Sequence, residues 1–238
     1  MNFSNKIILL TGASKGIGRQ LALSLAELGN HLSLVARNET ELRTLQTECE
    51  AKGVKCLVFA GSVSDEALVK KAVATTLTTF GKIDFMINNA GYGIFGSVES
   101  YTAEQWSDLY DTNVKGTFLF SKEVLESMKA VQSGHIINVA SDVAKRVFDG
   151  GALYCSSKFA QDAFSAALRK EVRKHKIKVS VVYSGLVDTP FHAPSENEDR
   201  KAEWLTPTDM ADSIIFVMSQ PKHVVIDELM IHPLGQEY

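Results

Sequence analysis

Residues 6–18 read KIILLTGASKGIG, a run of aliphatic side chains that ends in a turn with three glycines. The aliphatic run is typical of a buried strand, and the next segment, 17–29, carries Leu21, Leu25 and Leu28 at helical spacing. Glycines between a strand and a helix let the backbone approach a pyrophosphate, whose charge is attracted by the N–H groups at the helix start. The stretch therefore predicts a nucleotide site.

The spacing of the glycines narrows the kind of nucleotide site. Gly12, Gly16 and Gly18 follow the pattern Gly-x-x-x-Gly-x-Gly, which differs from the more familiar Gly-x-Gly-x-x-Gly. The turn also lacks the Gly-Lys-Ser/Thr ending of NTPase phosphate-binding loops. Because the turn follows a first buried strand and precedes an amphipathic helix, a binding role is favoured over chain reversal alone.

Aliphatic and β-branched runs recur along the chain, with helical stretches between them. Besides the first strand they are HLSLVAR, VKCLVFA, IDFMINNAG, GHIINVAS and IKVSVVYSG, which begin at residues 31, 54, 83, 134 and 177. Ser64 with Asp65 precedes a helical stretch, and Gly29 and Gly53 follow two others. Strands that alternate with helices predict an α/β doubly wound fold, a parallel sheet with helices on both faces.

We expect residues 1–238 to form a single domain, because no Pro/Gly/Ser-rich linker divides the chain and no repeat exceeds the strand-helix alternation. The exception to the regular rhythm is TPFHAPSENEDRKAEW, residues 189–204, which is polar and holds two of the five prolines. Long irregular inserts in compact domains are commonly functional or mobile. We interpret this insert as a mobile substrate lid.

Composition excludes several classes of protein. The chain of 238 residues is 45% hydrophobic and has a formal net charge of -3, so it can bury a core but has no basic surface for nucleic acid or an anionic membrane. Six scattered histidines predict no metal site, and three cysteines without a Cys-x-x-Cys pair favour a reducing compartment. With no signal peptide or membrane span in the sequence, we expect a cytoplasmic protein with small-molecule partners.

The end of the second strand bears on the choice of dinucleotide. A chain that prefers NAD is expected to place an acidic residue there, about 20 residues after the glycines, to hold the ribose diol. The sequence instead reads Ala36, Arg37, Asn38. Arg37 and Lys15 could together bind a 2′-phosphate, or Arg37 could be a solvated residue before a helix.

Two further stretches offer groups for chemistry. NNAG, residues 88–91, ends the fourth strand, where ligands bind in open α/β sheets, or it is simply an Asn-rich turn. YCSSKFAQDAF, residues 154–164, predicts a helix that presents Tyr154 and Lys158 on one face. A cation beside a phenol favours its ionised form, so this pair could transfer protons near neutral pH.

These motifs, taken in order along the chain, resemble those of the short-chain dehydrogenases/reductases. TGASKGIG resembles that family's cofactor loop, NNAG its fourth-strand motif and YCSSK its Tyr-x-x-x-Lys pair. Asn113 in DTNVKGTF and Ser141, thirteen residues before Tyr154, match its other two catalytic positions. The resemblance covers nearly the whole chain and implies a Rossmann fold of about seven parallel strands.

The resemblance implies which residues contact the cofactor, and Arg37 favours NADP(H) as that cofactor. The expected contacts are Gly12, Ser14, Lys15, Gly16, Ile17, Gly18, Arg37, Ser62, Val63, Asn89, Ala90, Gly91, Tyr154, Lys158, Gly185, Val187 and Thr189. The chain departs from the family pattern at two positions. Ser184 stands where many members have Pro, which we expect to loosen the loop, and Ser62 stands where an Asp often meets the adenine.

In the reducing direction, Tyr154 would donate a proton to the carbonyl oxygen while Ser141 hydrogen-bonds the same oxygen. Lys158 would lower the pKa of Tyr154 and, by resemblance, reach the ribose hydroxyls. Asn113, again by resemblance, positions a water that links Lys158 to solvent. The sequence thus predicts an oxidoreductase that transfers hydride between NADP(H) and a carbonyl or alcohol substrate.

The substrate stays open at this point, with a 3-oxoacyl thioester or another small ketone as candidates. The competing class is a non-enzymatic regulator that senses a dinucleotide, but a pure sensor needs no proton donor such as Tyr154. A dehydratase or epimerase would need a longer C-terminal region. Four aromatic residues either line a substrate pocket or belong to the core: Phe95, Phe148, Phe191 and Trp204.

Two helical regions, 106–128 and 157–172, resemble those through which family members pair as homodimers or homotetramers. Their apolar positions could equally face their own sheet. Cys155 lies about 100° around the helix from Tyr154, so we interpret it as a packing residue.

Overall fold

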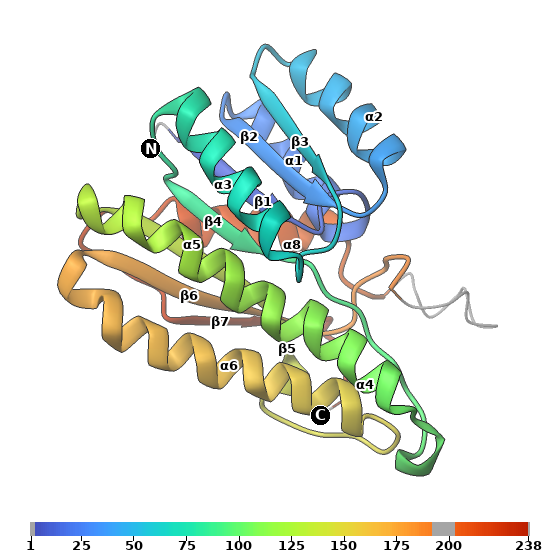
Figure 1. The fold of residues 1–238 in the computed structure, drawn as a ribbon. Coiled ribbons are helices and arrows are strands. Elements are labelled where there is room, and N and C mark those ends of the chain that lie inside the picture. The colour runs from blue at the N-terminus through green and yellow to red at the C-terminus, as the bar shows by residue number, and fades with distance from the viewer. Residues whose placement is uncertain (1–2, 192–202, 238) are drawn as a thin grey trace.

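The computed structural model describes residues 3–191 and 203–237, which contain one sheet of seven parallel strands (Figure 1). The strands lie in the order β3-β2-β1-β4-β5-β6-β7. They are β1 Ile7–Thr11, β2 His31–Ala36, β3 Cys56–Ala60, β4 Phe85–Asn88, β5 Gly134–Ser141, β6 Ile177–Ser184 and β7 Glu228–Ile231. This order confirms the predicted doubly wound fold, and β1 to β6 fall on the aliphatic runs quoted above.

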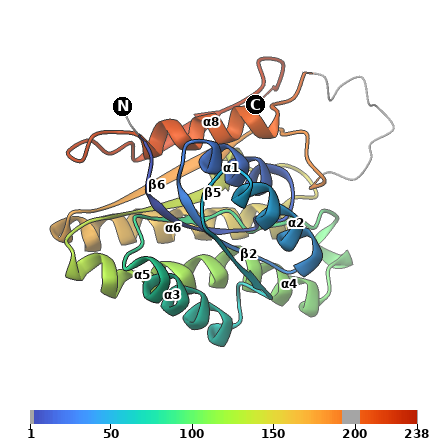
Figure 2. The same ribbon diagram turned by 90° about the horizontal axis from the view of Figure 1, so that it is seen from above.

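Helices cover both faces of the sheet, as the view in Figure 2 shows. One face packs against α1 Gly16–Glu27, α2 Glu39–Glu50 and α8 Pro207–Met218. The opposite face packs against α3 Glu66–Phe80, α5 Gly116–Ala130 and α6 Ala152–Val172. A shorter helix, α4 Ala103–Tyr110, continues into α5 through a π-helical turn, Asp111–Lys115. Single 3-10 turns lie at Val98–Ser100, Asp142–Ala144 and Arg173–His175.

The central strand β1 shows why the chain begins with a continuous aliphatic run. All five of its residues are buried. Ile8 and Leu10 belong to the core with α1 and α8, whereas Leu9 belongs to the core with α3 and α5. Successive side chains of a strand point to opposite faces, so a strand covered on both sides needs an apolar residue at every position.

The residues that begin and end three of the helices are those that the sequence predicts. Asp65 Oδ1 accepts hydrogen bonds from the backbone N–H groups of Ala67 and Leu68, at 2.9 and 3.4 Å, and so caps α3. Gly29 and Gly53 follow α1 and α2 with φ of +78° and +84°, a conformation that side chains with a Cβ rarely adopt. The predicted start of α3 and the two predicted helix ends are confirmed.

The strand order places a crevice at the carboxyl ends of the strands. From β1 the chain proceeds outward to β2 and β3, then crosses back to β4 on the other side of β1. The connections after β1 and β4 therefore diverge, and a crevice opens outside the ends of these two strands. The glycine turn after β1 and the NNAG stretch after β4 both lie at this switch point.

One strand of the sheet could not be recognised from the sequence pattern. β7 lies at the sheet edge and alternates exposed and half-buried residues, so it has no continuous aliphatic run by which to find it. Residues 192–202, most of the predicted lid, lie outside the described residues, and the lid stays a prediction.

Within the described chain, no helix has both the length and the apolar character needed to cross a membrane.

Candidate active site

A cleft of about 770 Å³ opens at the carboxyl ends of the strands. Its walls come from the glycine turn, from the segments that follow β2, β3 and β4, and from residues at the ends of β5 and β6. Tyr154 and Lys158 reach it from α6. Residues far apart in the sequence thus meet at one place because parallel strands end at the same edge of the sheet.

The glycine turn and the NNAG stretch pack so closely that side chains are excluded. Gly12 has φ of +67°, and a Cβ on it would lie 2.8 Å from backbone atoms of Ala90. Asn89 Nδ2 donates to the carbonyl oxygens of Thr11 and Gly12 at 3.2 and 3.1 Å, which ties the two segments together. The bare backbone at this turn, just before α1, fits the pyrophosphate of a dinucleotide.

Most residues that the sequence predicts to contact a dinucleotide line this cleft. They are Gly12, Ser14, Lys15, Gly16, Ile17, Arg37, Ser62, Val63, Asn89, Ala90, Gly91, Tyr154, Lys158, Gly185, Val187 and Thr189. Gly18 does not line it. A Cβ on Gly18 would overlap the carbonyl oxygen of Gly12, so this glycine lets α1 pack under the turn.

The end of the cleft beside β2 carries two cations and one carboxylate. Arg37 is exposed and makes no ion pair with any residue of the described ranges. Lys15 Nζ lies 3.0 Å from Glu41 Oε1, in the first turn of α2. The second oxygen of Glu41 is buried and has no hydrogen-bond partner among the described residues. Sequence reasoning found Arg37 and Lys15 but missed Glu41.

Tyr154 and Lys158 lie one turn apart on α6, and both side chains are nearly buried, with 8% and 5% exposed. Lys158 Nζ lies 5.9 Å from the centroid of the Tyr154 ring. The ammonium donates to Gln161 Oε1 at 3.0 Å and to the Val139 carbonyl oxygen at 3.3 Å. Burial lowers the pKa of Lys158 to about 8.

The pKa of Tyr154 corrects one expectation. Burial raises it above the ordinary value, and the nearby negative charge of Asp142 raises it further, while a hydrogen bond with Ser141 lowers it. The sequence predicted a lowered pKa because of Lys158. The opposite direction holds because desolvation of the buried phenol dominates its pKa.

Asn113 lies in the π-helical turn and is fully buried, so it does not line the cleft. Its side chain clamps the backbone of Tyr92, accepting from the N–H at 3.0 Å and donating to the carbonyl oxygen at 2.9 Å. A Cβ on Gly91 would lie 3.2 Å from Asn113 Oδ1 and 3.5 Å from Lys158 Nζ. Asn113, from behind the cleft wall, and Lys158, from the cleft itself, therefore both approach Gly91.

Behind Lys158, a chain of buried side chains leads to Asn113. Gln161 Nε2 donates to Thr117 Oγ1 at 3.0 Å, and Thr117 Oγ1 donates to the Asn113 carbonyl oxygen at 2.9 Å. Gln161 is fully buried and Thr117 is 3% exposed. The side chains of Gln161 and Thr117 thus link Lys158 to the backbone carbonyl of Asn113, and the water expected between Lys158 and solvent stays a prediction.

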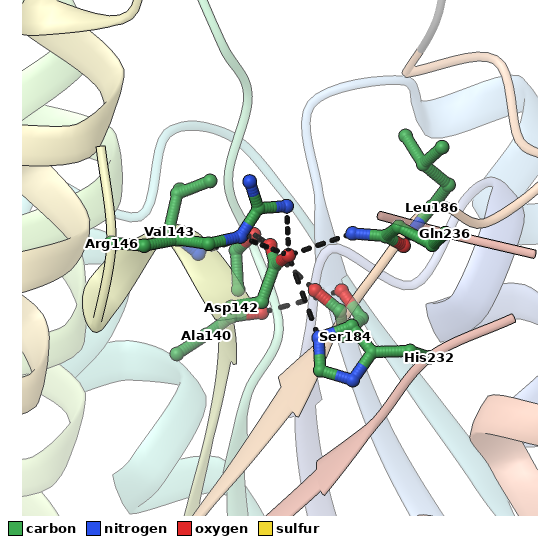
Figure 3. Close-up of polar contacts among 9 residues, drawn as sticks. Ala140, Asp142, Val143, Arg146, Ser184, Leu186, His232 and Gln236 are labelled. Carbon is green, nitrogen blue, oxygen red and sulfur yellow. Dashed lines mark hydrogen bonds and ion pairs between the residues drawn. The ribbon is translucent and has the colours of Figure 1, made fainter. Parts of the chain in front are cut away.

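Ser141 ends β5 beside a cluster of polar residues shown in Figure 3. Its Oγ can donate to Asp142 Oδ1 at 3.0 Å or to the Ser184 carbonyl oxygen at 3.3 Å. Asp142 is 3% exposed and accepts from Arg146 Nε at 2.9 Å and from Gln236 Nε2 at 2.8 Å. A hydroxyl has one hydrogen, so Ser141 must turn it away from these acceptors in order to bind a substrate oxygen.

Although Ser184 stands where many family members have Pro, hydrogen bonds hold the loop that follows β6. Gln236 Oε1 accepts from the Leu186 N–H at 2.7 Å, while Nε2 of the same amide donates to Asp142 (Figure 3). The Gly185 N–H donates to the Ile231 carbonyl oxygen at 2.8 Å. A Cβ on Gly185 would overlap the Gln236 amide, so a larger residue there would displace the Gln236 side chain. The expected loosening is opposed by these contacts.

Several residues of the site were missed from the sequence, and only some left a signal. Gln161 follows Lys158 by three residues on a predicted helix, so its place on the same face could have been inferred. Asp142 directly follows Ser141. Gln236 is 94 residues from Asp142, and no local pattern indicates that β7 brings the two together.

Comparison with known proteins identifies the class: the chain is an NAD(P)-dependent oxidoreductase. It belongs to the short-chain dehydrogenase family, whose sequence profile, described as short chain dehydrogenase, matches residues 6–200. The resemblance inferred from the motifs is thereby confirmed.

Three relatives illustrate the similarity. A sepiapterin reductase of Chlorobaculum tepidum is 32% identical over 234 residues, covering 95% of this chain and 96% of the relative. An alcohol dehydrogenase of the archaeon Thermococcus sibiricus, solved with 5-hydroxy-NADP, is 28% identical with a TM-score of 0.89 and 99% of each chain covered. A metagenomic short-chain oxidoreductase solved with NADP is 28% identical with a TM-score of 0.86, covering 99% of this chain and 100% of the other.

Proposed function

We propose that this protein is an NADP(H)-dependent carbonyl reductase or alcohol dehydrogenase acting on a small ketone or the corresponding alcohol. The observation that carries the proposal is the meeting of Tyr154, Ser141 and Lys158 in a cleft that also contains the glycine turn. The raised pKa of Tyr154 keeps the phenol in the protonated form that reduction requires.

In the proposed mechanism the bound nicotinamide supplies the hydride, and the chain orients the reactants and handles the proton. Tyr154 donates its proton to the carbonyl oxygen, and Ser141 turns its hydroxyl from Asp142 to the same oxygen to stabilise developing charge. Lys158 keeps a positive charge beside the phenol and stabilises the phenolate left after donation. Asn113 acts through the backbone, by holding the Tyr92 segment beside Gly91.

NADP(H) is the proposed cofactor. Arg37 offers a planar set of donors at the end of β2, where a 2′-phosphate would lie, and its charge has no ion-pair partner among the described residues. Lys15 adds a second cation. Val187 and Thr189 after β6 would meet the carboxamide of the nicotinamide. The NADP-type ligands of the two solved relatives named above support the same choice.

The proposed reductase is tested by replacing the proton donor. Tyr154→Phe removes the phenol oxygen with little change in contact area, so we expect kcat for ketone reduction to fall by roughly two orders of magnitude or more. The dissociation constant for NADPH, measured by fluorescence titration, should change little. Tyr110→Phe is the matched control, since Tyr110 stacks on Trp106 and does not line the cleft. Retention of more than about a tenth of wild-type kcat in Tyr154→Phe would falsify the assignment.

We also propose that residues 1–238 form one domain that pairs with a second copy through α4, α5 and α6. All seven strands belong to one sheet, which supports a single domain. Trp106 on α4, Phe118 on α5 and Phe159 on α6 are 48%, 43% and 42% exposed, and large exposed aromatic side chains are typical of interfaces. Sedimentation velocity of the wild type and of Phe118→Glu measures whether a dimer or tetramer forms through this surface.

A further inference from the structure

Three phenylalanines cluster in the cleft, two of them in contact with the Tyr154 ring and the third packed on Phe95. Phe95 follows β4, Phe148 follows β5 and Phe191 follows β6, so each of three adjacent strands contributes one ring from the segment after its carboxyl end. The ring centroids of Phe95 and Phe191 both lie 5.5 Å from that of Tyr154, and Phe148 lies 5.9 Å from Phe95. These three rings, called the aromatic wall below, stand beside the proposed proton donor.

The aromatic wall is not ordinary core. Phe95 and Phe148 are 47% and 40% exposed, whereas Tyr154 beside them is 8% exposed. Apolar side chains of this size are normally buried away from water. An exposed group of them inside a cleft is typical of a ligand-binding surface. The sequence left open whether these phenylalanines belong to a pocket or to the core. The exposure of Phe95 and Phe148 in the cleft favours the pocket, whereas Phe191 lines the cleft but is half-buried against Tyr154.

Glycines make room for the rings. A Cβ on Gly93 would lie 2.6 Å from a ring atom of Phe95 and 2.9 Å from one of Phe191. A Cβ on Gly151 would lie 2.7 Å from ring atoms of Phe148. The backbone beneath the aromatic wall therefore has to lack side chains for the rings to take these positions.

One cation that lines this cleft close to Phe148 in the sequence, Arg146, is already compensated. Arg146 forms a two-point ion pair with Asp142, whose carboxylate also accepts from Gln236 (Figure 3). A sugar needs hydrogen-bond partners along its whole length, and a phosphate-bearing acyl thioester needs a cation with spare charge. The aromatic wall instead offers apolar faces to a neutral, flat group.

We infer that the preferred substrate is an aryl ketone, a carbonyl compound with an aromatic ring next to the reacting carbon. This inference rests on the proposed reductase function. The ring packs against the aromatic wall, offset or edge-on to Phe95 and Phe148, while the carbonyl oxygen reaches the hydroxyls of Tyr154 and Ser141. The reaction is two-electron reduction: NADPH gives hydride to the carbonyl carbon, Tyr154 gives the proton to the oxygen, and a secondary alcohol and NADP⁺ result.

Matched diketones provide the test. With NADPH oxidation as readout, 1-phenyl-1,2-propanedione and 2,3-butanedione differ by a phenyl in place of a methyl group. We expect the phenyl compound to have a kcat/KM at least roughly tenfold higher. Phe95→Leu should lower this phenyl-to-methyl ratio by about tenfold, and Phe148→Leu, on a different segment, should lower it in the same direction. Phe216→Leu is the control, because Phe216 is 55% exposed on α8 and does not line the cleft.

The possible outcomes distinguish a failure of the reductase function from a failure of the aryl preference. If no ketone, sugar or acyl thioester is reduced, the reductase function fails and the aryl preference with it. If reduction occurs but L-sorbose, acetoacetyl-CoA or 2,3-butanedione is the better substrate, the reductase stands and the aryl inference is wrong. An unchanged ratio in both Phe95→Leu and Phe148→Leu would equally overturn the role of the aromatic wall.

Discussion

Lys15 Nζ and Glu41 Oε1 lie 3.0 Å apart, so the lysine expected to meet a 2′-phosphate is already paired with a carboxylate. Both residues line the cleft together with Arg37. A phosphate bound there would bring negative charge close to Glu41, whose second oxygen is buried without a hydrogen-bond partner in the described chain. Glu41 therefore opposes the attraction that Arg37 and Lys15 exert on NADPH.

We predict that Glu41→Gln tightens NADPH binding by about threefold to tenfold, because it removes a repelling charge and frees Lys15, whose exposed pair with Glu41 is weak. NADH, which has no 2′-phosphate, should bind as before. Arg37→Glu should act in the opposite sense and reverse or erase the preference for NADPH. Fluorescence titration of both cofactors at fixed ionic strength measures each dissociation constant.

Glu39→Gln is the matched control, since Glu39 lies in the same turn of α2 but pairs with Arg43 and does not line the cleft. Equal tightening of NADH and NADPH by Glu41→Gln would show that Glu41 does not sense the 2′-phosphate. A preference unaltered by Arg37→Glu would show that Arg37 is a solvated surface residue.

Gln236 should position the loop after β6. Gln236→Leu leaves the Leu186 N–H without its acceptor and Asp142 without one donor, so we expect a several-fold weaker affinity for NADPH. Gln236→Glu alone should also weaken binding, because it places a carboxylate against Asp142.

The double variant Asp142→Asn with Gln236→Glu exchanges donor and acceptor and should recover part of the affinity. NADPH dissociation constants for the wild type, the two single variants and the double variant form the required cycle. A double variant no better than the weaker single one argues that the Asp142–Gln236 hydrogen bond does not set the loop.

The sequence was sufficient for the fold because buried parallel strands leave a strong signal. β1 is buried along its whole length and is apolar at four of its five positions, and such a run can be read directly. β7 could not be found in this way, because its four residues alternate exposed and half-buried at the sheet edge. Gln236, which β7 brings to the site, was missed for the same reason.

Within the site, what could be predicted were residues whose type and spacing suffice, such as Tyr154 with Lys158 on one helix face. How burial changes the pKa values of these residues could not be predicted. Desolvation raises the pKa of Tyr154 although a lysine lies nearby, and the size of this effect depends on packing that no motif encodes. Glu41 was missed because its contact with Lys15 depends on how helix α2 packs beside the glycine turn, which no local pattern indicates.

The stability of the fold should depend on pH through His135. Its ring is buried and bonds Ser180 Oγ at 2.7 Å, and burial lowers the pKa of His135 to about 3. The unfolded chain therefore binds one more proton than the folded chain between pH 3 and the ordinary pKa near 6.5. The contribution of His135 to the free energy of unfolding should be constant above that ordinary pKa and fall by about 1.4 kcal/mol per pH unit between it and about pH 3.

Urea unfolding at a series of pH values measures the slope. His135→Gln keeps a partner for Ser180 and does not titrate, so its slope should be smaller by one proton. His223→Gln is the control, because His223 is exposed. If the slopes of wild type and His135→Gln coincide, His135 is not the group responsible.

Activity should depend on pH through Lys158, and Gln161 should set where the change occurs. Burial raises the pKa of Tyr154, so the phenol stays protonated while Lys158, with a pKa of about 8, loses its charge. A neutral lysine no longer stabilises the phenolate, so kcat/KM for reduction should fall as pH rises through about 8.

Gln161 Oε1 accepts a hydrogen bond from the Lys158 ammonium and thereby favours its charged form. Gln161→Leu should move the fall in kcat/KM to lower pH by roughly one unit, the equivalent of one hydrogen bond to a charged group. Gln161→Glu should move it to higher pH, because a carboxylate favours the ammonium more strongly than an amide does. Opposite shifts distinguish an electrostatic role from mere packing, which would lower activity at every pH without moving the profile. A ¹³C NMR titration of the Lys158 Cε, assigned with Lys158→Met, follows the same pKa without turnover, and identical values in all three proteins would exclude this role for Gln161.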